Sequence, residues 1–256
     1  MCTVTLIPLA GDDASKAGSG YRLLTNRDES RQRRPALPPH TVEVRSGDAS
    51  PRHAIAPTDA DAGGTWIAVT TAGLTATLLN ANPPGLAPHE RPRGRRSRGE
   101  LIAKLWGEPD AARACDALGG IDASDYAPFR LVVTDGQRVG ECRGDTKSLA
   151  IALSPTGDRP RLWTSSGLGD HVVEPPRREL FEGWFSADPS AWPAEQDAFH
   201  RQCRPDRGEL GVCMAREDAR TVSLTAVEVH SRAVRMTYHA GPPCEAAEDF
   251  DLELPR

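Results

Sequence analysis

The sequence predicts an α+β sandwich of antiparallel strands, with helices that cover the faces of the sheets. The elements come in blocks along the chain: strands, two helices, strands, two helices, and strands again. Tight turns join consecutive strands, which favours antiparallel pairing. Gly 23 and Pro 22 among 256 residues indicate many turns and short elements.

The chain begins with two predicted strands and a long connection. Residues 2–7 (CTVTLI) and 21–25 (YRLLT) are rich in apolar and β-branched side chains, as strands are. A polar loop punctuated by proline is expected for about residues 30–57. These two strands are therefore the only regular elements that we predict before residue 58.

A hairpin and a first helix follow. Residues 66–71 and 74–79 flank a short turn that contains Gly73, a pattern that predicts a β-hairpin. After a loop rich in Pro and Arg, Ser97 is placed to cap a helix, with Glu100 three residues later in the capping-box position.

The rest of the chain continues the alternation of helices and strands. Further helices are expected at about residues 110–118, 176–185 and 193–201. Further strands are expected at residues 130–134, 138–142, 149–153, 162–164, 211–215, 221–229 and 233–239, followed by a polar tail. With neither a repeat nor a linker, residues 1–256 are predicted to form one domain.

Charge and hydropathy exclude several classes of protein. The formal net charge of −5 argues against a general binder of nucleic acid or of membrane surfaces. No run approaches 18 apolar residues, so no integral membrane contact is expected. The N-terminus lacks the basic and apolar pattern of a signal peptide, which favours a cytoplasmic protein.

The cysteines are scattered and form no C-x-x-C pair. They are Cys2, Cys115, Cys142, Cys203, Cys213 and Cys244. A zinc site of standard spacing is therefore not expected, and no histidine pair has ligand spacing either. Without a secretion signal the thiols should stay reduced. We predict neither a metal nor a cofactor.

Cys2 is the first candidate catalytic residue. Removal of Met1 would leave a cysteine that carries both a thiol and a free α-amino group. The amine titrates near 8, at about the pH range of the thiol, so it can accept the proton of the nucleophile. The alternative is that Cys2 packs as a small hydrophobe at the start of a buried strand.

The polar run Asn26-Arg27-Asp28-Glu29 continues the second predicted strand. Because side chains alternate along a strand, at least one of the two pairs should point toward the interior or the mouth of the sheet. Asp28 is placed to orient the N-terminal amine, and Arg27 to hold a substrate carboxylate. A turn with a structural salt bridge is the alternative.

Two further groups of polar side chains have a candidate role. Asn80 and Asn82 follow the hairpin, where an amide can donate to a developing oxyanion, although asparagines also end strands without any such role. An arginine-rich loop can contact a phosphate-bearing ligand or form a solvated basic loop. Its members are Arg91, Arg93, Arg95, Arg96 and Arg98.

Several short motifs together resemble one known family. They are Met1-Cys2-Thr3-Val4, Asn26-Arg27-Asp28-Glu29, Ala56-Pro57-Thr58-Asp59, Gly63-Gly64-Thr65-Trp66 and Leu79-Asn80, with Val212-Cys213-Met214 and Thr221-Val222-Ser223 later in the chain. In this order they resemble the NRDE family, relatives of the eukaryotic transport and Golgi organisation protein 2.

The resemblance implies a fold and a set of site residues. The fold is the N-terminal-nucleophile hydrolase sandwich, with four αββα layers built on two stacked antiparallel sheets. By motif position, the catalytic residues are Cys2, Asp28 and Asn80. Asn26, Arg27, Trp66 and Asn82 are the predicted substrate-binding residues.

The chain departs from related choloylglycine hydrolases and acyltransferases at three positions. Thr25 stands where those enzymes place an arginine before the Asp, and Ser165-Ser166 stand where a second oxyanion Asn is expected. Val222 lies near the position of an arginine of the late strand.

Two functions follow from the sequence. The first is a cysteine hydrolase or acyltransferase that acts on a small non-peptide amide or acyl substrate, an amidohydrolase of non-peptide C–N bonds. The alternative is a binding or trafficking protein without catalysis, whose hydrophobic ligand is haem, a lipid or acyl-CoA. The departures favour the alternative, and neither function identifies a protein partner.

Overall fold

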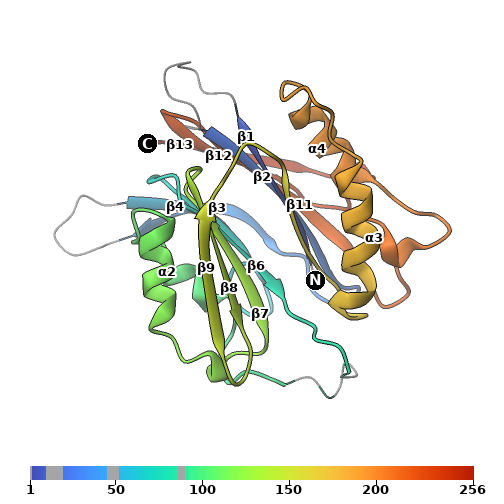
Figure 1. Cartoon of the computed structure of the whole chain (residues 1–256), viewed down its shortest axis with the longest axis horizontal. Coiled ribbons are helices and arrows are strands. Elements are labelled where there is room, and N and C mark those ends of the chain that lie inside the picture. Colours follow the sequence, from blue (N-terminus) through green and yellow to red (C-terminus); the bar gives the residue numbers. More distant parts are fainter. Residues whose placement is uncertain (1, 10–19, 45–51, 86–89, 91) are drawn as a thin grey trace.

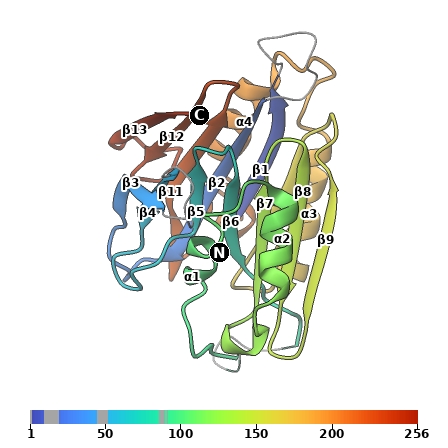
Figure 2. The ribbon, with the colours of Figure 1, turned by 90° about the vertical axis from the view of Figure 1, so that its left-hand side faces the viewer.

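Two antiparallel sheets stack face to face in the computed structural model, and helices cover the outer face of each sheet (Figure 1). The structure describes residues 2–9, 20–44, 52–85, 90 and 92–256. In the turned view, α2 lies in front of one sheet and α3 and α4 lie behind the other (Figure 2). This arrangement confirms the predicted αββα sandwich.

The first sheet has six strands in the order β10-β1-β2-β11-β12-β13. Their bounds are β1 (Cys2–Leu9), β2 (Gly20–Ser30), β10 (Arg161–Ser165), β11 (Ala219–Val229), β12 (Ala233–His239) and β13 (Asp249–Pro255). The two longest strands, β2 and β11, pair at its centre. β2 is therefore paired along both edges.

The second sheet has seven strands in sequence order, from β3 to β9. Their bounds are β3 (Leu37–Val44), β4 (Arg52–Thr58), β5 (Ile67–Thr70), β6 (Thr75–Asn80), β7 (Phe129–Thr134), β8 (Arg138–Gly144) and β9 (Leu149–Pro155). β5 and β6 form the predicted hairpin, and Gly73 adopts the positive φ of 81° that its turn requires.

Four α-helices complete the layers. Their bounds are α1 (Glu100–Ala103), α2 (Ala111–Gly119), α3 (Asp170–Glu182) and α4 (Trp192–Arg201). Asp110 caps α2, where its side chain accepts a hydrogen bond from Arg113 N at 2.9 Å. None of the helices in the described part of the chain is long and apolar enough to cross a membrane.

The main core lies between the sheets. Val4 and Leu6 of β1 face it together with Ile67 and Val69 of β5, and all four are 0% exposed. Full burial of such a side chain stabilises the fold by roughly 1.5–3 kcal/mol. A second cluster packs α1 and α2 against the outer face of the seven-stranded sheet.

The structure corrects four sequence predictions. The predicted loop at residues 30–57 contains β3 and β4, and the polar tail contains β13. β3 and β13 lie at the edges of their sheets, where a strand can be largely polar, although Phe250, Leu252 and Leu254 of β13 pack against the main core.

The other two corrections concern short segments. Residues 211–215 form no strand beyond one isolated bridge, between Ala215 and Arg220. Ser97 does not cap α1, whose N-cap is Gly99, and this helix is a single turn. Tertiary packing of Leu101 and Ile102, both 0% exposed, replaces the predicted cap.

Candidate functional site

A cavity of about 510 Å³ lies where the start of β1 meets the ends of β2 and β6. Cys2, Arg27 and Asn80 line it from these three strands. The loop before β5 adds Trp66, and the loop that precedes α1 adds several arginines. The cavity thus brings together five of the seven predicted site residues, Cys2, Arg27, Trp66, Asn80 and Asn82.

Cys2 lies in the sheet between Arg27 of β2 and Ser165 of β10. Its backbone nitrogen donates a hydrogen bond to Ser165 Oγ at 3.2 Å. The residue is 5% exposed. Burial raises the pKa of the Cys2 thiol, and the negative charges of Asp28 and Glu29 act in the same direction. The thiol therefore needs a base to become a nucleophile at neutral pH.

Arg27 lies directly across the sheet from Cys2 and faces the same cavity. Its guanidinium donates to Asp59 Oδ2 at 2.6 Å and lies 3.3 Å from Glu29 Oε1. It also stacks over the Trp66 ring, 4.3 Å from the ring centroid. These contacts hold Arg27 in place at the cavity wall.

Asp28 points to the opposite, helix-covered face of the sheet and is 1% exposed. Thr221 Oγ1 donates to its carboxylate at 2.6 Å. Burial raises the pKa of Asp28, whereas the positive charge of Arg177 acts to lower it. Asp28 is absent from the described lining of the cavity, so its predicted action on the N-terminal amine would reach Cys2 from behind the strand.

Asn26 also faces the helices and is 0% exposed. Its Nδ2 donates to the carbonyls of His200 and Val212, each at 2.9 Å, and its Oδ1 lies 3.0 Å from His200 Nδ1. The residue is absent from the described lining of the cavity. Its predicted contact with substrate has no support in this geometry, since its amide joins α4 to β2.

His200 is held as the neutral imidazole. Burial, together with the charge of Arg22, lowers the pKa of His200 to about 3. Nε2 lies 2.8 Å from Thr5 Oγ1, a hydroxyl that also accepts from Gln196 Nε2 at 2.8 Å. We infer that Thr5 donates to Nε2 and that Nδ1 carries the proton given to Asn26.

The side-chain amides of Asn80, at the end of β6, and Asn82 differ in whether they already have a hydrogen-bond partner. Asn82 is fixed by Asp170 at the start of α3, which accepts from Asn82 N at 2.8 Å and from Nδ2 at 3.2 Å. Asn80 lines the cavity, and within the described residues its side chain makes no hydrogen bond. Asn80 is therefore the amide that is available to a bound substrate.

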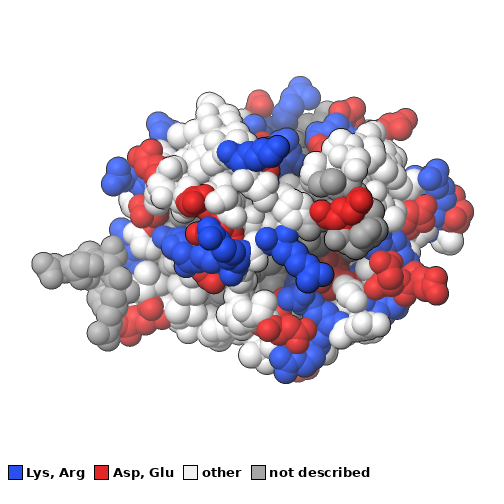
Figure 3. Space-filling view, turned by 90° about the horizontal axis from the view of Figure 1, so that it is seen from below, with Lys and Arg blue, Asp and Glu red and all other residues white. Residues whose placement is uncertain are grey.

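The arginine-rich loop lies over the cavity. Arg93, Arg96 and Arg98 line it, whereas Arg95 pairs with Asp125 at 2.7 Å. Arg91 lies outside the described residues. Seen from below, Lys and Arg side chains gather in the middle of the face of the molecule (Figure 3).

Backbone contacts fix this loop. Arg96 forms a parallel bridge with Tyr126, and its nitrogen donates to Asp125 O at 2.9 Å. A Cβ at Gly94 would collide with the backbone of Tyr126 and Ala127, so the loop can approach this closely only through glycine.

Arg98 is the most enclosed arginine of the loop. Its Nη1 donates to Pro128 O at 2.9 Å, and burial lowers the pKa of its guanidinium. Arg98 forms no ion pair with a described residue, although the charge of Glu29 acts on it. A half-buried cation that makes no ion pair favours an anionic group on a ligand.

Sequence analysis missed four residues that support the site: Ser165, Asp170, Arg177 and Thr221. Arg177 is 1% exposed and donates to Thr3 Oγ1 and Thr164 Oγ1, each at 2.8 Å. Its charge acts on Asp28 from α3, whereas Thr25 and Val222 occupy the two strand positions at which the resemblance implies an arginine. Of the four, Thr221 lies in a motif that the sequence singled out, and Ser165 was noted only as a departure from the resemblance.

Comparisons with known proteins agree with this architecture. The family model for Transport and Golgi organisation 2 matches residues 9–173. The solved penicillin V acylase from Agrobacterium tumefaciens is 12% identical with a TM-score of 0.54, over 98% of this chain and 86% of that chain. At this identity the likeness shows a shared fold alone.

Two further solved structures are more distant. An N-acylethanolamine-hydrolyzing acid amidase ortholog from Caenorhabditis elegans is 13% identical with a TM-score of 0.47, over 88% of this chain and 92% of that chain. A mutant conjugated bile acid hydrolase from Clostridium perfringens is 10% identical with a TM-score of 0.48, over 98% and 92%. No curated protein matches the chain.

Proposed function

Since the chain belongs to the Transport and Golgi organisation 2 family and shares the fold of penicillin V acylase, we propose that it is an N-terminal cysteine hydrolase or acyltransferase. The proposed substrate is a small non-peptide amide or acyl compound. The observation that carries this proposal is the position of Cys2, at the wall of a cavity of about 510 Å³ that also receives Asn80.

The proposed reaction begins when removal of Met1 frees the α-amino group of Cys2. The amine takes the thiol proton, and the sulfur forms a bond to the carbonyl carbon of the substrate. Asn80 Nδ2 donates to the oxyanion of the tetrahedral intermediate, an interaction worth roughly 3–4 kcal/mol in comparable sites.

Collapse of this intermediate breaks the C–N bond, and the amine leaves with the proton that the α-amino group returns. Water, or another acceptor, then attacks the thioester, so that the acid or the transferred acyl group departs and the thiol is restored. The hydrogen bond from Cys2 N to Ser165 Oγ at 3.2 Å supports this role, because it holds the proposed base in a fixed orientation.

The charge of the cavity favours an acidic substrate. Arginines from β2, from the connection after it and from the loop before α1 line it: Arg27, Arg33, Arg93, Arg96 and Arg98. Glu29 and Asp59 are the carboxylates in the described lining, and they lie beside Arg27 and Arg33. In the loop, Arg96 pairs with Glu100 at 2.7 Å, so Arg93 and Arg98 are the described loop arginines that can face a carboxylate or phosphate of the ligand.

The test is a panel of acyl amides in pairs, each pair having one acidic and one neutral member. Wild-type protein should hydrolyse the acidic members, and intact mass should show an acyl adduct on residue 2. The Cys2→Ala variant should form neither product nor adduct. Equal turnover by the variant and the wild type would remove Cys2 from the reaction.

The alternative is a protein that binds haem, a lipid or acyl-CoA on the same fold without catalysis. Two observations favour this alternative. Burial raises the pKa of the Cys2 thiol, which disfavours the nucleophilic thiolate. The side-chain amide of Asn82 donates to Asp170, so it is not free to donate to a substrate. A purified chain that keeps Met1 and gives a Soret shift on haem titration would support this alternative. A free residue 2 that can be alkylated would support catalysis.

A further inference from the structure

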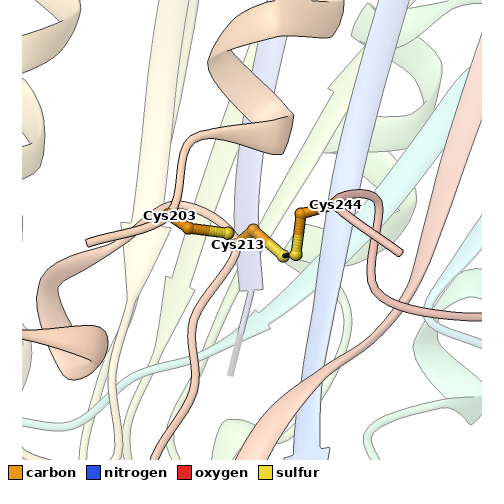
Figure 4. Close-up of side chains that lie close together, drawn as sticks. All are labelled: Cys203, Cys213 and Cys244. Carbon is orange, nitrogen blue, oxygen red and sulfur yellow. Dashed lines mark hydrogen bonds between the residues drawn. The ribbon is translucent and has the colours of Figure 1, made fainter. Parts of the chain in front are cut away.

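Three cysteines that are distant in the sequence converge on the side of the molecule that carries α4 (Figure 4). Cys203 follows α4, Cys213 precedes β11, and Cys244 lies in the connection between β12 and β13. Their sulfur atoms all lie within 4.8 Å of one another. These three cysteines are thus scattered along the sequence but adjacent in the fold.

Backbone contacts that do not involve sulfur fix this convergence. Cys213 N donates to Gln202 O at 2.9 Å, so the segments of Cys203 and Cys213 are joined. On either side of Cys213, Asn26 Nδ2 donates to Val212 O at 2.9 Å and Met214 N donates to Thr221 Oγ1 at 2.8 Å. These contacts place Cys203 and Cys213 together, and the connection between β12 and β13 brings Cys244 to them.

The donor set is chemically uniform. The group contains three sulfur atoms and no imidazole or carboxylate ligand. Cys213 is buried, whereas Cys203 and Cys244 are exposed, so an ion can enter from solvent. Glu245, next to Cys244 and also exposed, lies 3.7 Å from Arg220, so its negative charge is shared between that arginine and the cluster. Soft thiolates of this kind select zinc and copper(I) over magnesium and calcium.

We propose that Cys203, Cys213 and Cys244 form a binding site for one thiophilic metal ion, zinc(II) or copper(I), held by three thiolates. Binding would release the thiol protons to solvent as the metal–sulfur bonds form. With metal–sulfur bonds of about 2.3 Å, the ligand sulfurs lie roughly 4 Å apart.

This spacing requires one small movement. Cys213 Sγ and Cys244 Sγ now lie 2.9 Å apart, so Cys244 would turn outward by about 1 Å to reach the metal-bound spacing. Cys244 is exposed and has room to do so. A disulfide between these two residues would use two sulfurs, whereas the structure brings three together.

The bound ion would tie the end of α4 to the segments that flank β11 and β12. Next to one ligand, Met214 N donates to the hydroxyl of Thr221 in β11, which in turn donates to Asp28. The site is separate from the proposed Cys2 chemistry and does not depend on it.

The test measures metal binding by the fully reduced chain. Reduced, metal-free protein is titrated with Zn²⁺ and, without oxygen, with Cu⁺, and bound metal is measured by elemental analysis and by competition with a chromophoric chelator. We expect one equivalent bound and a higher melting temperature. The relative affinities of the two titrations identify the metal.

The two exposed cysteines of the proposed site can be substituted with little risk to folding. Cys203→Ser and Cys244→Ser should each weaken binding by more than about 100-fold, because loss of a hydrogen bond to a ligand alone costs roughly 10–100-fold. Circular dichroism checks that both variants fold. Cys2→Ala keeps the three sulfurs and should bind as tightly as the wild type.

Two outcomes would overturn the proposal. One is binding that survives in Cys244→Ser but is lost in Cys2→Ala. The other is reduced protein that takes up no metal, together with a Cys213–Cys244 disulfide in protein exposed to oxidised glutathione. That result would assign the cluster to thiol–disulfide exchange, in which the disulfide forms as two glutathione thiols are released.

Discussion

The two faces of β2 carry different kinds of polar group, although their residues alternate along one strand. On the helix-covered face, Asn26 and Asp28 are 0% and 1% exposed and are hydrogen-bonded to neighbouring segments. On the cavity face, Arg27 and Glu29 form an ion pair beside an open space that other arginines share.

This difference shows that the run from Asn26 to Glu29 contributes both to the packing of the helices on the sheet and to the wall of the cavity. Buried groups on the helix face are satisfied by fixed partners, so removing one leaves its partners unpaired. Cavity-facing groups have partners that solvent or a ligand can replace. We therefore expect substitutions on the helix face to change stability, and substitutions at the cavity to change binding and turnover.

The largest effect on stability is expected from Arg177→Met on the helix face. The substitution removes the donors to Thr3, Thr164 and Gly211 O and leaves Asp28 without the nearby positive charge. Unfolding in urea should show a loss of about 3–5 kcal/mol. Arg178→Met, at an exposed pair with Glu174, is the control and should cost less than about 1 kcal/mol.

A smaller loss is expected from Asn26→Ala, which leaves the carbonyls of His200 and Val212 without their donors. Urea unfolding should show about 2 kcal/mol of destabilisation. Asn80→Ala is the matched cavity variant, and it should leave stability almost unchanged but reduce turnover. Equal stability of the two variants would contradict the distinction between the faces.

The pH dependence of stability should show the buried His200. Its pKa is lowered to about 3, whereas an unfolded histidine titrates near 6.5. At a pH between these two pKa values, His200 is protonated in the unfolded state but neutral in the folded state. The free energy of unfolding therefore falls as the pH falls below about 6.5. The expected slope is about 1.4 kcal/mol per pH unit from this group.

This slope can be isolated by substitution. Urea unfolding at several pH values should give a shallower dependence for His200→Gln than for the wild type. His230→Gln, at an exposed position, should retain the wild-type slope. A His200 variant with an unchanged slope would show that the imidazole is protonated in the folded state.

The smallest effect is expected at the cavity from Arg98→Gln. The variant should raise KM for an acidic acyl amide about tenfold, because one charge-assisted hydrogen bond to the ligand is lost. KM for the neutral member of the pair should not change. Arg95→Gln, whose side chain is 76% exposed and pairs with Asp125, is the control for loss of positive charge in the loop. An equal rise in KM for both substrates would contradict a direct contact.

Much of the fold could be predicted from the sequence because its signals are local. The hairpin around Gly73 and the helix predicted at about residues 110–118 need only neighbouring residues. β3 escaped prediction because an edge strand can be polar and still pair, whereas the alternation of polar and apolar residues in β13 was overlooked within a polar tail. The isolated bridge at residues 215 and 220 shows the opposite error, where an apolar run lacks a partner strand.

The candidate site was predictable only in part. Cys2, the run from Asn26 to Glu29, and Asn80 are recognised from residue type and order. Alternation along β2 indicates that Asn26 and Arg27 face opposite ways, but it does not say which face has the cavity. Asp170 and Arg177 carry no sequence signal, since their partners lie 88 and 174 positions away in the chain.

The sequence by itself determined the succession of strands and helices and the placement of a cysteine at the start of the first strand. These depend on propensity and on short-range periodicity, which any segment carries alone. The tertiary structure decided that arginines of the loop before α1 lie over Cys2, that Asn26 belongs to the framework, and that Cys203, Cys213 and Cys244 meet. Such contacts form only when strands distant in the chain pair and stack, because burial of the shared core fixes their relative positions.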